Sequence, residues 1–246
     1  MKITFLGTSH GVPEAHRLCS CSLITVGEGE NASRYFIDMG MQPVGELVNR
    51  GIPLESVKAV FLTHMHGDHT DGVLSLVDLC SWYFKKALPT FFYPEQAGID
   101  VTKSWVEATG CKFREEIPMK LVEEGPLYDD GVLKVTAYRT KHCAVSYAYL
   151  LEAEGKRVLF TGDLCTKGPA EDFPVQAAKD EALDLVVCEC AHFGAMTYEP
   201  IFKNCKLKKV LVNHYQPRRT PEVAQLAQAL APLPVALAND GLEVTV

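Results

Sequence analysis

Hydrophobic and polar positions along the chain follow two alternating patterns. Short apolar runs rich in β-branched and aromatic residues predict strands, and longer stretches with apolar residues at helical spacing predict helices between them. The predicted strands are KITFLG (2–7), SLITV (22–26), YFIDMG (35–40), VKAVFLTH (57–64), PTFFYP (89–94), LKVTAYRT (133–140), SYAYLLEA (146–153), KRVLFTGD (156–163), DLVVCEC (184–190), KVLVNHY (209–215), PVALA (234–238) and LEVTV (242–246). The predicted helices cover 41–51, 70–87, 95–110, 169–182 and 221–230. Strand–helix units occur in both halves, which favours an α/β protein with helices packed on sheets.

Local signals set several of the predicted boundaries. Gly51 is expected to end the first helix, and Thr70 or Asp71 is expected to cap the second. Pro221 suits the first turn of the last helix. The sequence shows no internal repeat, no low-complexity segment and no linker, so we expect a single domain over 1–246.

Composition narrows the class of protein. The chain has 246 residues, of which 47% are hydrophobic and 22% charged, which is typical of a globular protein with a sizeable core. No apolar run approaches the ~18 residues of a membrane span, and the N-terminal stretch does not resemble a secretory signal, so a cytoplasmic protein is expected. Nine scattered cysteines without a C-x-x-C pair predict reduced thiols. The net charge of −7 argues against a generic nucleic-acid coat protein.

One internal stretch carries unusual chemistry. THMHGDHTDG (63–72) places His64, His66, Asp68 and His69 within six positions, although the chain has only eight histidines. An extended backbone would send His64 and His66 to the same side, and Gly67 would let the chain turn. Imidazole and carboxylate are the ligands that suit zinc and similar ions, so this stretch predicts a metal site.

Further ligand types follow other predicted strands. They are Asp38 after YFIDMG, His142 after VTAYRT, Asp163 at the end of RVLFTGD and His214 near the end of KVLVNHY. Each lies where an apolar strand turns polar, which is where loops hold functional side chains on a rigid scaffold. Taken alone, any of them is more often an ordinary hydrogen-bonded residue, but four together beside the cluster favour a common site.

These motifs resemble the metallo-β-lactamase superfamily, and within it the ribonuclease Z-like branch. The likeness rests on THMHGDH, FLGTSHGVP (5–13), HCAVSYAYLLE, LFTGD, VNHYQPR and ANDGLEV, which run the length of the chain. It implies an α/β fold of the metallo-β-lactamase type, an αβ/βα four-layer sandwich.

The resemblance also implies a ligand arrangement. One metal ion would be bound by His64, His66 and His142, and the other by Asp68, His69 and His214. Asp163 would bridge the two ions. Asp38 matches an acid that orients the ligands, as metal-binding histidines generally require. Zinc is the first choice for the two divalent ions, and manganese and iron also fit these ligands.

The chain departs from the branch at two places. The branch has an H-E-A-T motif whose histidine and glutamate support proton delivery to the leaving group. Here VCECAHFG offers Glu189, with Cys188 in place of the histidine and His192 as a substitute. Arg218 could bind a phosphate oxygen, although an exposed loop position is the simpler reading. His142 and Asp163 are separated only by a tight hairpin, which leaves no room for a tRNA-gripping arm.

The function expected is hydrolysis of phosphodiester bonds. Two ions can lower the pKa of a bridging water and clamp a phosphoryl group, so a bridging hydroxide is the expected nucleophile, with Asp68 able to orient it. The substrate would be small or short, such as a cyclic nucleotide, a cyclic phosphate or an RNA end. Hydrolysis of carboxylic esters, thioesters or lactones, tRNA 3′ cleavage, and a sensor protein without turnover remain alternatives. We expect no membrane partner and no extended tRNA binding, and a homodimer is compatible with the sequence.

Overall fold

Two mixed β-sheets, each with both parallel and antiparallel strand pairs, form the centre of the protein. The computed structural model describes residues 1–179 and 181–246, and within them each sheet has seven strands. The first sheet, in spatial order, consists of β14 (Glu243–Thr245), β1 (Lys2–Gly7), β2 (Cys21–Val26), β3 (Ser33–Met39), β4 (Val57–Phe61), β5 (Thr90–Tyr93) and β6 (Met119–Leu121). The second consists of β13 (Val235–Leu237), β12 (Val210–Tyr215), β11 (Leu185–Cys190), β10 (Lys156–Phe160), β9 (Ser146–Ala153), β8 (Lys134–Thr140) and β7 (Gly125–Asp129).

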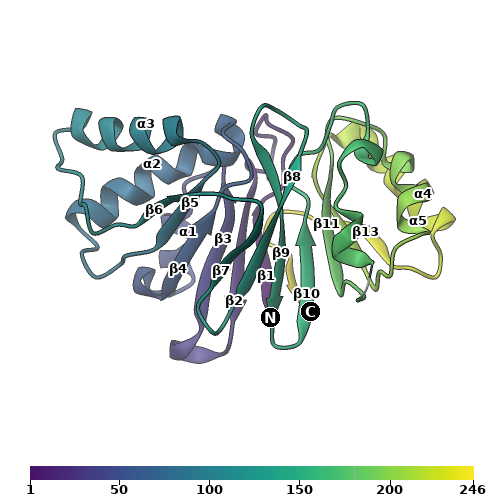
Figure 1. Cartoon of the computed structure of the whole chain (residues 1–246), viewed down its shortest axis with the longest axis horizontal. Helices are drawn as coiled ribbons and strands as arrows, with labels where there is room; N and C mark the ends of the chain where they lie inside the picture. The colour runs from purple at the N-terminus through teal and green to yellow at the C-terminus, as the bar shows by residue number, and fades with distance from the viewer. Residues whose placement is uncertain (180) are drawn as a thin grey trace.

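Helices cover the outer face of each sheet, so the order of layers is helix, sheet, sheet, helix (Figure 1). On the first sheet lie α1 (Val44–Asn49), α2 (Gly67–Trp82) and α3 (Gln96–Ala108). On the second lie α4 (Glu199–Phe202) and α5 (Thr220–Ala229), with short 3₁₀ turns. This is the four-layer sandwich that the sequence motifs predict.

The alternation of side chains along the strands explains the layers. In β1, Ile3 and Phe5 point between the two sheets, where they join the central apolar cluster with Tyr149 and Phe160 of the second sheet. Leu23 of β2 belongs instead to the cluster under the helices. Because successive strand residues face opposite sides, one apolar strand can supply both layers.

Most predicted elements are present, but the start of α2 was predicted wrongly. The helix begins at Gly67, and the residue before it is His66, so neither Thr70 nor Asp71 is the cap. The Thr70 hydroxyl donates to the His66 carbonyl within the first turn. The turn at Gly67 therefore starts the helix itself and places Asp68 in its first turn, where the helix dipole favours a negative charge.

The polar stretch 169–182 is not the α-helix that its pattern predicted. Its described residues form only the 3₁₀ turns Pro169–Glu171 and Val175–Ala178, and residue 180 lies outside the described part of the chain. Pro174 interrupts the segment, and Asp172 uses its carboxylate to bind two loops of the second sheet.

That the chain forms a single domain over 1–246 stays a prediction. In the described residues, no helix is long and apolar enough to cross a membrane.

Candidate metal centre

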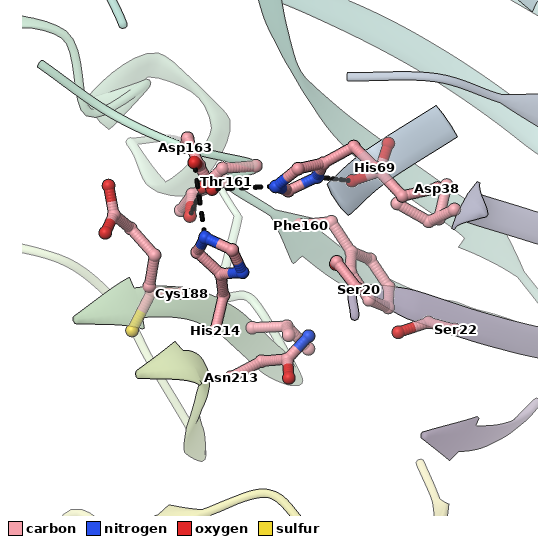
Figure 2. Close-up of a pocket in the computed structure, with 14 residues that line it drawn as sticks. Ser20, Ser22, Asp38, His69, Phe160, Thr161, Asp163, Cys188, Asn213 and His214 are labelled. Carbon is pink, nitrogen blue, oxygen red and sulfur yellow. Dashed lines mark hydrogen bonds and ion pairs between the residues drawn. The ribbon is translucent and has the colours of Figure 1, made fainter. Parts of the chain in front are cut away.

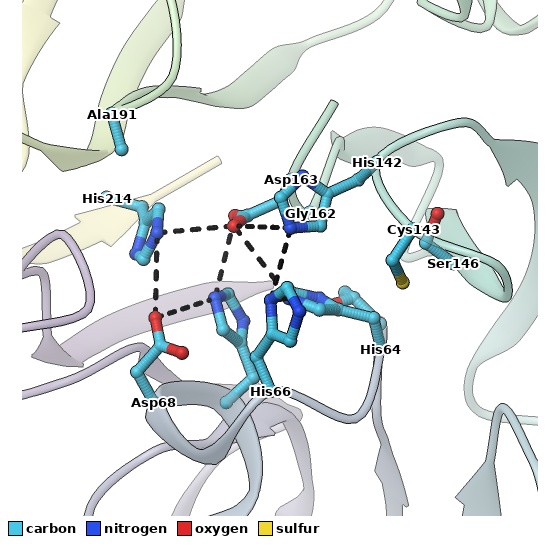
Figure 3. A network of polar contacts seen from close by, with 12 residues as sticks. His64, His66, Asp68, His142, Cys143, Ser146, Gly162, Asp163, Ala191 and His214 are labelled. Carbon is cyan, nitrogen blue, oxygen red and sulfur yellow. Dashed lines mark hydrogen bonds and ion pairs between the residues drawn. The ribbon is translucent and has the colours of Figure 1, made fainter. Parts of the chain in front are cut away.

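The predicted ligand side chains meet at one edge of the two sheets. His64 and His66 follow β4, and Asp68 and His69 lie in the first turn of α2. His142 follows β8, Asp163 follows β10, and His214 lies on β12. Figure 3 shows these side chains converging, with Asp163 in the middle. The sequence separates them by up to 150 positions, and the fold brings them together because each follows or ends a strand at the same edge.

Three histidines form one side of the cluster. His66 Nδ1 lies 2.9 Å from His64 Nε2 and 3.2 Å from His142 Nε2. The Asp163 carboxylate closes this side, with its Oδ2 atom 3.8 Å from His64 Nε2 and 3.6 Å from His142 Nε2. The ring nitrogens therefore face a shared point.

The other side combines two acids with two histidines. His69 Nε2 lies 3.3 Å from Asp68 Oδ2 and 3.5 Å from Asp163 Oδ1. His214 Nε2 lies 3.7 Å from Asp68 Oδ2 and 3.3 Å from Asp163 Oδ2. Asp163 thus contacts both halves of the cluster, as expected of a group that bridges two ions.

The donor set fits divalent metal ions. The groups His64–His66–His142, His64–His69–Asp163 and Asp68–His69–His214 each place their ligand atoms within 4.8 Å of one another. His69 Nε2 and Asp163 Oδ1 are buried and have no hydrogen-bond partner among the described residues. Buried polar atoms are nearly always satisfied, so two such atoms facing each other suit a shared cation. Imidazole and carboxylate are also the donor types that zinc accepts.

Charge states in the cluster follow from burial and from the acids. Burial lowers the pKa of His64 to about 2, and the neighbouring charge of His69 acts in the same direction. Burial also acts to lower the pKa of His69, but Asp163 and Asp38 outweigh it and raise that pKa well above its usual value. His64 is therefore neutral, with an Nε2 lone pair turned to the cluster.

Asp38 contacts the cluster from the side opposite Asp163, and its predicted role in orienting the ligands stays a prediction. Its Oδ2 atom lies 2.7 Å from His69 Nδ1, and its Oδ1 atom accepts a hydrogen bond of 2.8 Å from the Thr63 backbone N–H. The Thr63 hydroxyl donates to the same carboxylate and lies 3.1 Å from His64 Nδ1. Sequence reasoning missed Thr63, although its place directly before His64 was a usable signal.

The backbone is strained at two of these positions. Asp38 has φ 58° and His214 has φ 46°, in the left-handed region where a side chain other than glycine costs about 1–3 kcal/mol. Gly40 allows the chain after Asp38 to pass close to the backbone of Asp68, because a Cβ at Gly40 would lie 1.6 Å from the Asp68 carbonyl oxygen. Strain of this kind persists only where the surroundings fix it, and it is common at functional sites.

Glu189 and His192 form a pair beside the cluster. Glu189 is 1% exposed, and its carboxylate accepts hydrogen bonds from the backbone N–H groups of Leu164, Ala191 and His192. His192 Nδ1 lies 3.0 Å from each Glu189 oxygen and 3.8 Å from Asp163 Oδ2. Burial acts to lower the pKa of His192, but the hydrogen bond and charge of Glu189 outweigh it and raise the pKa.

Arg218 is not tied to the cluster. It is exposed on the short turn Pro217–Arg219, and within the described residues it makes no ion pair. Its neighbour Arg219 pairs with Glu222 at 2.8 Å. A contact between Arg218 and substrate stays a prediction.

The loop after β1 also reaches the cluster. A Cβ added at Gly11 would lie 3.3 Å from Asp68 Oδ2, so this loop passes over the acid. His10 in the same loop pairs with Glu14 at 2.9 Å, and Arg17 stacks on the ring of Tyr215 at 3.8 Å. Arg17 thereby joins the loop to the strand that carries His214, a role that the sequence did not reveal.

Comparison with known proteins places this geometry in a family. Residues 1–225 match the family described as anti-Pycsar protein Apyc1. The chain belongs to this family.

Ribonucleases are among the curated relatives of this Apyc1-family chain. Ribonuclease BN of Escherichia coli O7:K1 is 29% identical over 159 residues, which are 63% of this chain and 51% of the relative. Ribonuclease Z of Geobacillus kaustophilus is 31% identical over 153 residues, which are 61% of this chain and 48% of the relative. The chain thus spans about half the length of the curated relatives it matches.

Solved structures confirm the fold. The metallo-β-lactamase fold protein YhfI from Bacillus subtilis matches with a TM-score of 0.76 at 18% identity, over 99% of both chains. Human tRNase Z, short form, matches with a TM-score of 0.74 at 19% identity, over 100% of this chain and 99% of that one. Zinc-bound PqqB from Methylobacterium extorquens matches with a TM-score of 0.68 at 15% identity, over 100% of both chains. The predicted metallo-β-lactamase fold and the resemblance to the ribonuclease Z-like branch are confirmed.

Proposed function

We propose that this protein is a binuclear metal-dependent phosphodiesterase that acts on a small or short phosphodiester. The observation that carries the proposal is the convergence of six imidazole and carboxylate side chains around Asp163, with the Glu189–His192 pair at its side. His64, His66 and His142 would hold one divalent ion, Asp68, His69 and His214 the other, and Asp163 both. Zinc is the first choice, in keeping with the donor types.

Such ions would supply charge to the phosphoryl oxygens and make a water molecule acidic enough to attack. The protein's own residues do the remaining work. Asp68 is partly open, with 18% of its side chain exposed, so its carboxylate can accept a hydrogen bond from the attacking water and orient it. Asp38 and Thr63 keep the rings of His69 and His64 in place.

His192 is the proposed proton donor. Glu189 holds its Nδ1 atom, which leaves Nε2 free to give a proton to the departing oxygen of the ester. Because Glu189 uses its oxygens on backbone N–H groups and on His192, its role is to position His192 and to keep it charged. The arrangement replaces the branch's histidine–glutamate pair by the same two residue types at a different spacing.

The size of the expected substrate follows from the surface around the cluster. β9 and β10 pair from Ala153–Lys156 up to Tyr149–Phe160, so the hairpin between His142 and Asp163 carries no arm. The net charge of −7 also disfavours a long polyanion. Cyclic nucleotides, cyclic phosphates and short RNA ends fit better than pre-tRNA.

A substrate panel tests the proposal. Purified protein loaded with zinc or manganese is assayed against bis-p-nitrophenyl phosphate, cyclic nucleotides, cyclic phosphates, lactones and thioesters. Metal content is measured on the same samples by mass spectrometry. We expect turnover of phosphodiesters, loss of turnover in Asp163→Ala, and full turnover in His16→Ala, which removes an exposed histidine outside the cluster.

The alternatives have their own outcomes. Metal-loaded protein that leaves every phosphodiester intact overturns the proposal, and turnover of lactones or thioesters alone would assign the site to carboxylic ester chemistry. Cleavage of pre-tRNA that weakens steeply with rising salt would identify a tRNA 3′ endonuclease instead.

A further inference from the structure

Each histidine of the cluster has two ring nitrogens. In most of these histidines, the nitrogen that is turned away from the cluster contacts a polar group of the protein. His64 Nδ1 lies 3.1 Å from the Thr63 hydroxyl, His69 Nδ1 lies 2.7 Å from Asp38, and His142 Nδ1 lies 3.2 Å from the Leu164 carbonyl oxygen. Histidines that bind metal nearly always donate this second N–H to an acceptor, which fixes the tautomer and the ring.

His214 breaks this pattern. Its Nε2 atom faces Asp163 and Asp68, but its Nδ1 atom is buried and has no hydrogen-bond partner among the described residues. A buried N–H with no acceptor is rare in folded proteins. The residue before it, Asn213, shows the same feature, because its Oδ1 atom is also buried and without a partner.

A small cavity is lined by both residues. It measures about 20 Å³ and adjoins the metal cluster, because Asp38, His69 and Asp163 also line it. Figure 2 shows His214 with one nitrogen joined to Asp163 and the other turned from it, with Ser20, Ser22 and Asn213 around the same space. These polar side chains line the cavity, and all of them are at most 6% exposed.

We propose that this cavity is a binding site for one water molecule that completes the hydrogen bonding of His214. A buried water needs about 10–15 Å³ and typically makes about three hydrogen bonds, and this cavity has the volume and polar side chains in its lining. The water accepts a hydrogen bond from the His214 Nδ1–H group. It donates one hydrogen bond to Asn213 Oδ1 and another to a serine hydroxyl. Ser20, Ser22 and Asn213 are then positioning residues that act on His214 through the water.

The bound water has a consequence for the cluster. It keeps the His214 proton on Nδ1 and therefore leaves the Nε2 lone pair directed at Asp68 and Asp163. The inference rests on the proposed function only in treating His214 as a ligand. His214 also has a left-handed backbone, with φ 46°.

Crystallography of the whole protein, with and without metal, is the direct test. We expect one density peak in the cavity, about 2.7–3.2 Å from both His214 Nδ1 and Asn213 Oδ1. A cavity without density at high resolution, or a direct protein partner on Nδ1, would overturn the inference. The metal-free crystal also shows whether the water is present. A protein that binds no metal would therefore contradict the proposed function but would leave the water inference to be decided by the metal-free crystal.

Variants at Ser22 extend the test to solution. Ser22→Val fills the cavity with methyl groups, whereas Ser22→Thr keeps the hydroxyl. We expect Ser22→Val to weaken binding of the ion next to Asp68 about 10-fold, measured by competition with a chromophoric chelator, and Ser22→Thr to recover most of the loss. The control is Ser81→Ala, which removes a buried serine on α2 whose hydroxyl donates to the Val77 carbonyl oxygen.

Nitrogen-15 NMR of the histidine rings separates positioning from general destabilisation. In the wild-type protein, the His214 Nδ1 proton should be observed and protected from exchange even without metal. In Ser22→Val, that signal should shift or exchange faster while the signal of His69 stays in place. Unchanged His214 signals together with unchanged metal affinity in Ser22→Val would refute the inference, and Ser22→Ala gives the same readouts if the valine variant does not fold.

Discussion

Several single residues in this site act by holding another side chain. Glu189 binds three backbone N–H groups and the ring of His192, and it is almost completely buried. A carboxylate with this many fixed donors cannot turn toward substrate without leaving N–H groups unsatisfied. In the proposed function, the proton for the leaving group would therefore come from His192, and the effect of removing His192 should be visible only where the leaving group needs a proton.

This gives a prediction about leaving groups. His192→Ala should lower kcat by about 10²–10⁴-fold for an alkyl or nucleoside leaving group, because general acid catalysis is lost. For p-nitrophenolate, which departs without a proton, the loss should be much smaller. Steady-state kinetics on the two substrate types check this, with metal content as the control. Equal losses on both substrates would assign His192 a role in binding instead.

The residue types at the site were largely predictable, and their supports were not. The cluster His64–His69 and the polar ends of three later strands are visible in the sequence because each follows an apolar run. The carbonyl oxygen of Leu164, which binds His142, carries no signal at all, since every residue has one. The left-handed backbone of Asp38 and His214 was equally hidden, because neither is glycine.

At the scale of elements, the buried strands and the edge strands β13 and β14 were predicted, and two other edge strands were not. β4, β9 and β12 are almost continuous apolar runs, and the structure has them where the pattern predicted. The edge strands β6 and β7 were missed, because their side chains are mostly exposed and show no clear alternation. The same limit applies to 169–182, where polar periodicity predicted a helix but tertiary hydrogen bonds decide the shape.

Asp172 gives the prediction that belongs to this scale. Its Oδ2 atom accepts hydrogen bonds of 2.7 Å from the Lys141 N–H and 2.9 Å from the Cys165 N–H. These residues lie next to His142 and two positions beyond Asp163, so one side chain fixes the ends of β8 and β10. Asp172→Ala should weaken metal binding at the site by about 10-fold, measured by chelator competition.

An amide is the matched control for Asp172. Burial raises the pKa of this carboxyl, which shows that its charge is not favoured there. Asp172→Asn keeps an oxygen that can accept both N–H groups and removes the charge, so it should bind metal nearly as well as the wild type. Loss of affinity in Asp172→Asn equal to that in Asp172→Ala would show that the charge, and not the hydrogen bonds, matters.

At the scale of the whole molecule, one polar contact joins the two sheets. Tyr35 of β3 donates to Asp130 Oδ2 at 2.7 Å, and Tyr128 of β7 donates to the same oxygen at 2.9 Å. Asp130 thus joins the first sheet to the second at a position far along the chain. Burial acts to raise its pKa, but the N–H groups of Leu133 and Val132 and the two hydroxyls outweigh it and lower the pKa.

The sign of the pH dependence follows. A carboxyl whose pKa is lower in the folded state stabilises the fold above its unfolded pKa of about 3.9, and this contribution is lost as the pH falls through the folded value. Asp130→Asn should therefore be less stable than the wild type at pH 7 by about 1 kcal/mol, after allowance for solvent exposure. The difference should shrink below about pH 4 in urea denaturation experiments. A difference that is constant with pH would contradict it.

Metal removal should also destabilise the whole molecule. An ion that binds only the folded state adds about 2.7 kcal/mol of stability at a free concentration 100 times its dissociation constant. Calorimetry should show a lower Tm after treatment with a chelator, and a restored Tm after zinc or manganese is added back. A chelator that leaves Tm unchanged, in a sample shown to have contained metal, would mean that the ions do not bridge the two sheets.

The division of ligands between the sheets has an implication for how the molecule assembles. Four of the seven proposed ligands come from the first half of the chain, which builds β1 to β6, and three come from the second half, which builds β7 to β13. A partly folded chain with only the first sheet formed would have an incomplete set of metal donors. Asp163, the proposed ligand of both ions, would be in place only after the second half had folded. High-affinity uptake of the cation pair would then mark the final docking event during biogenesis, and a nascent polypeptide would sequester little metal before it.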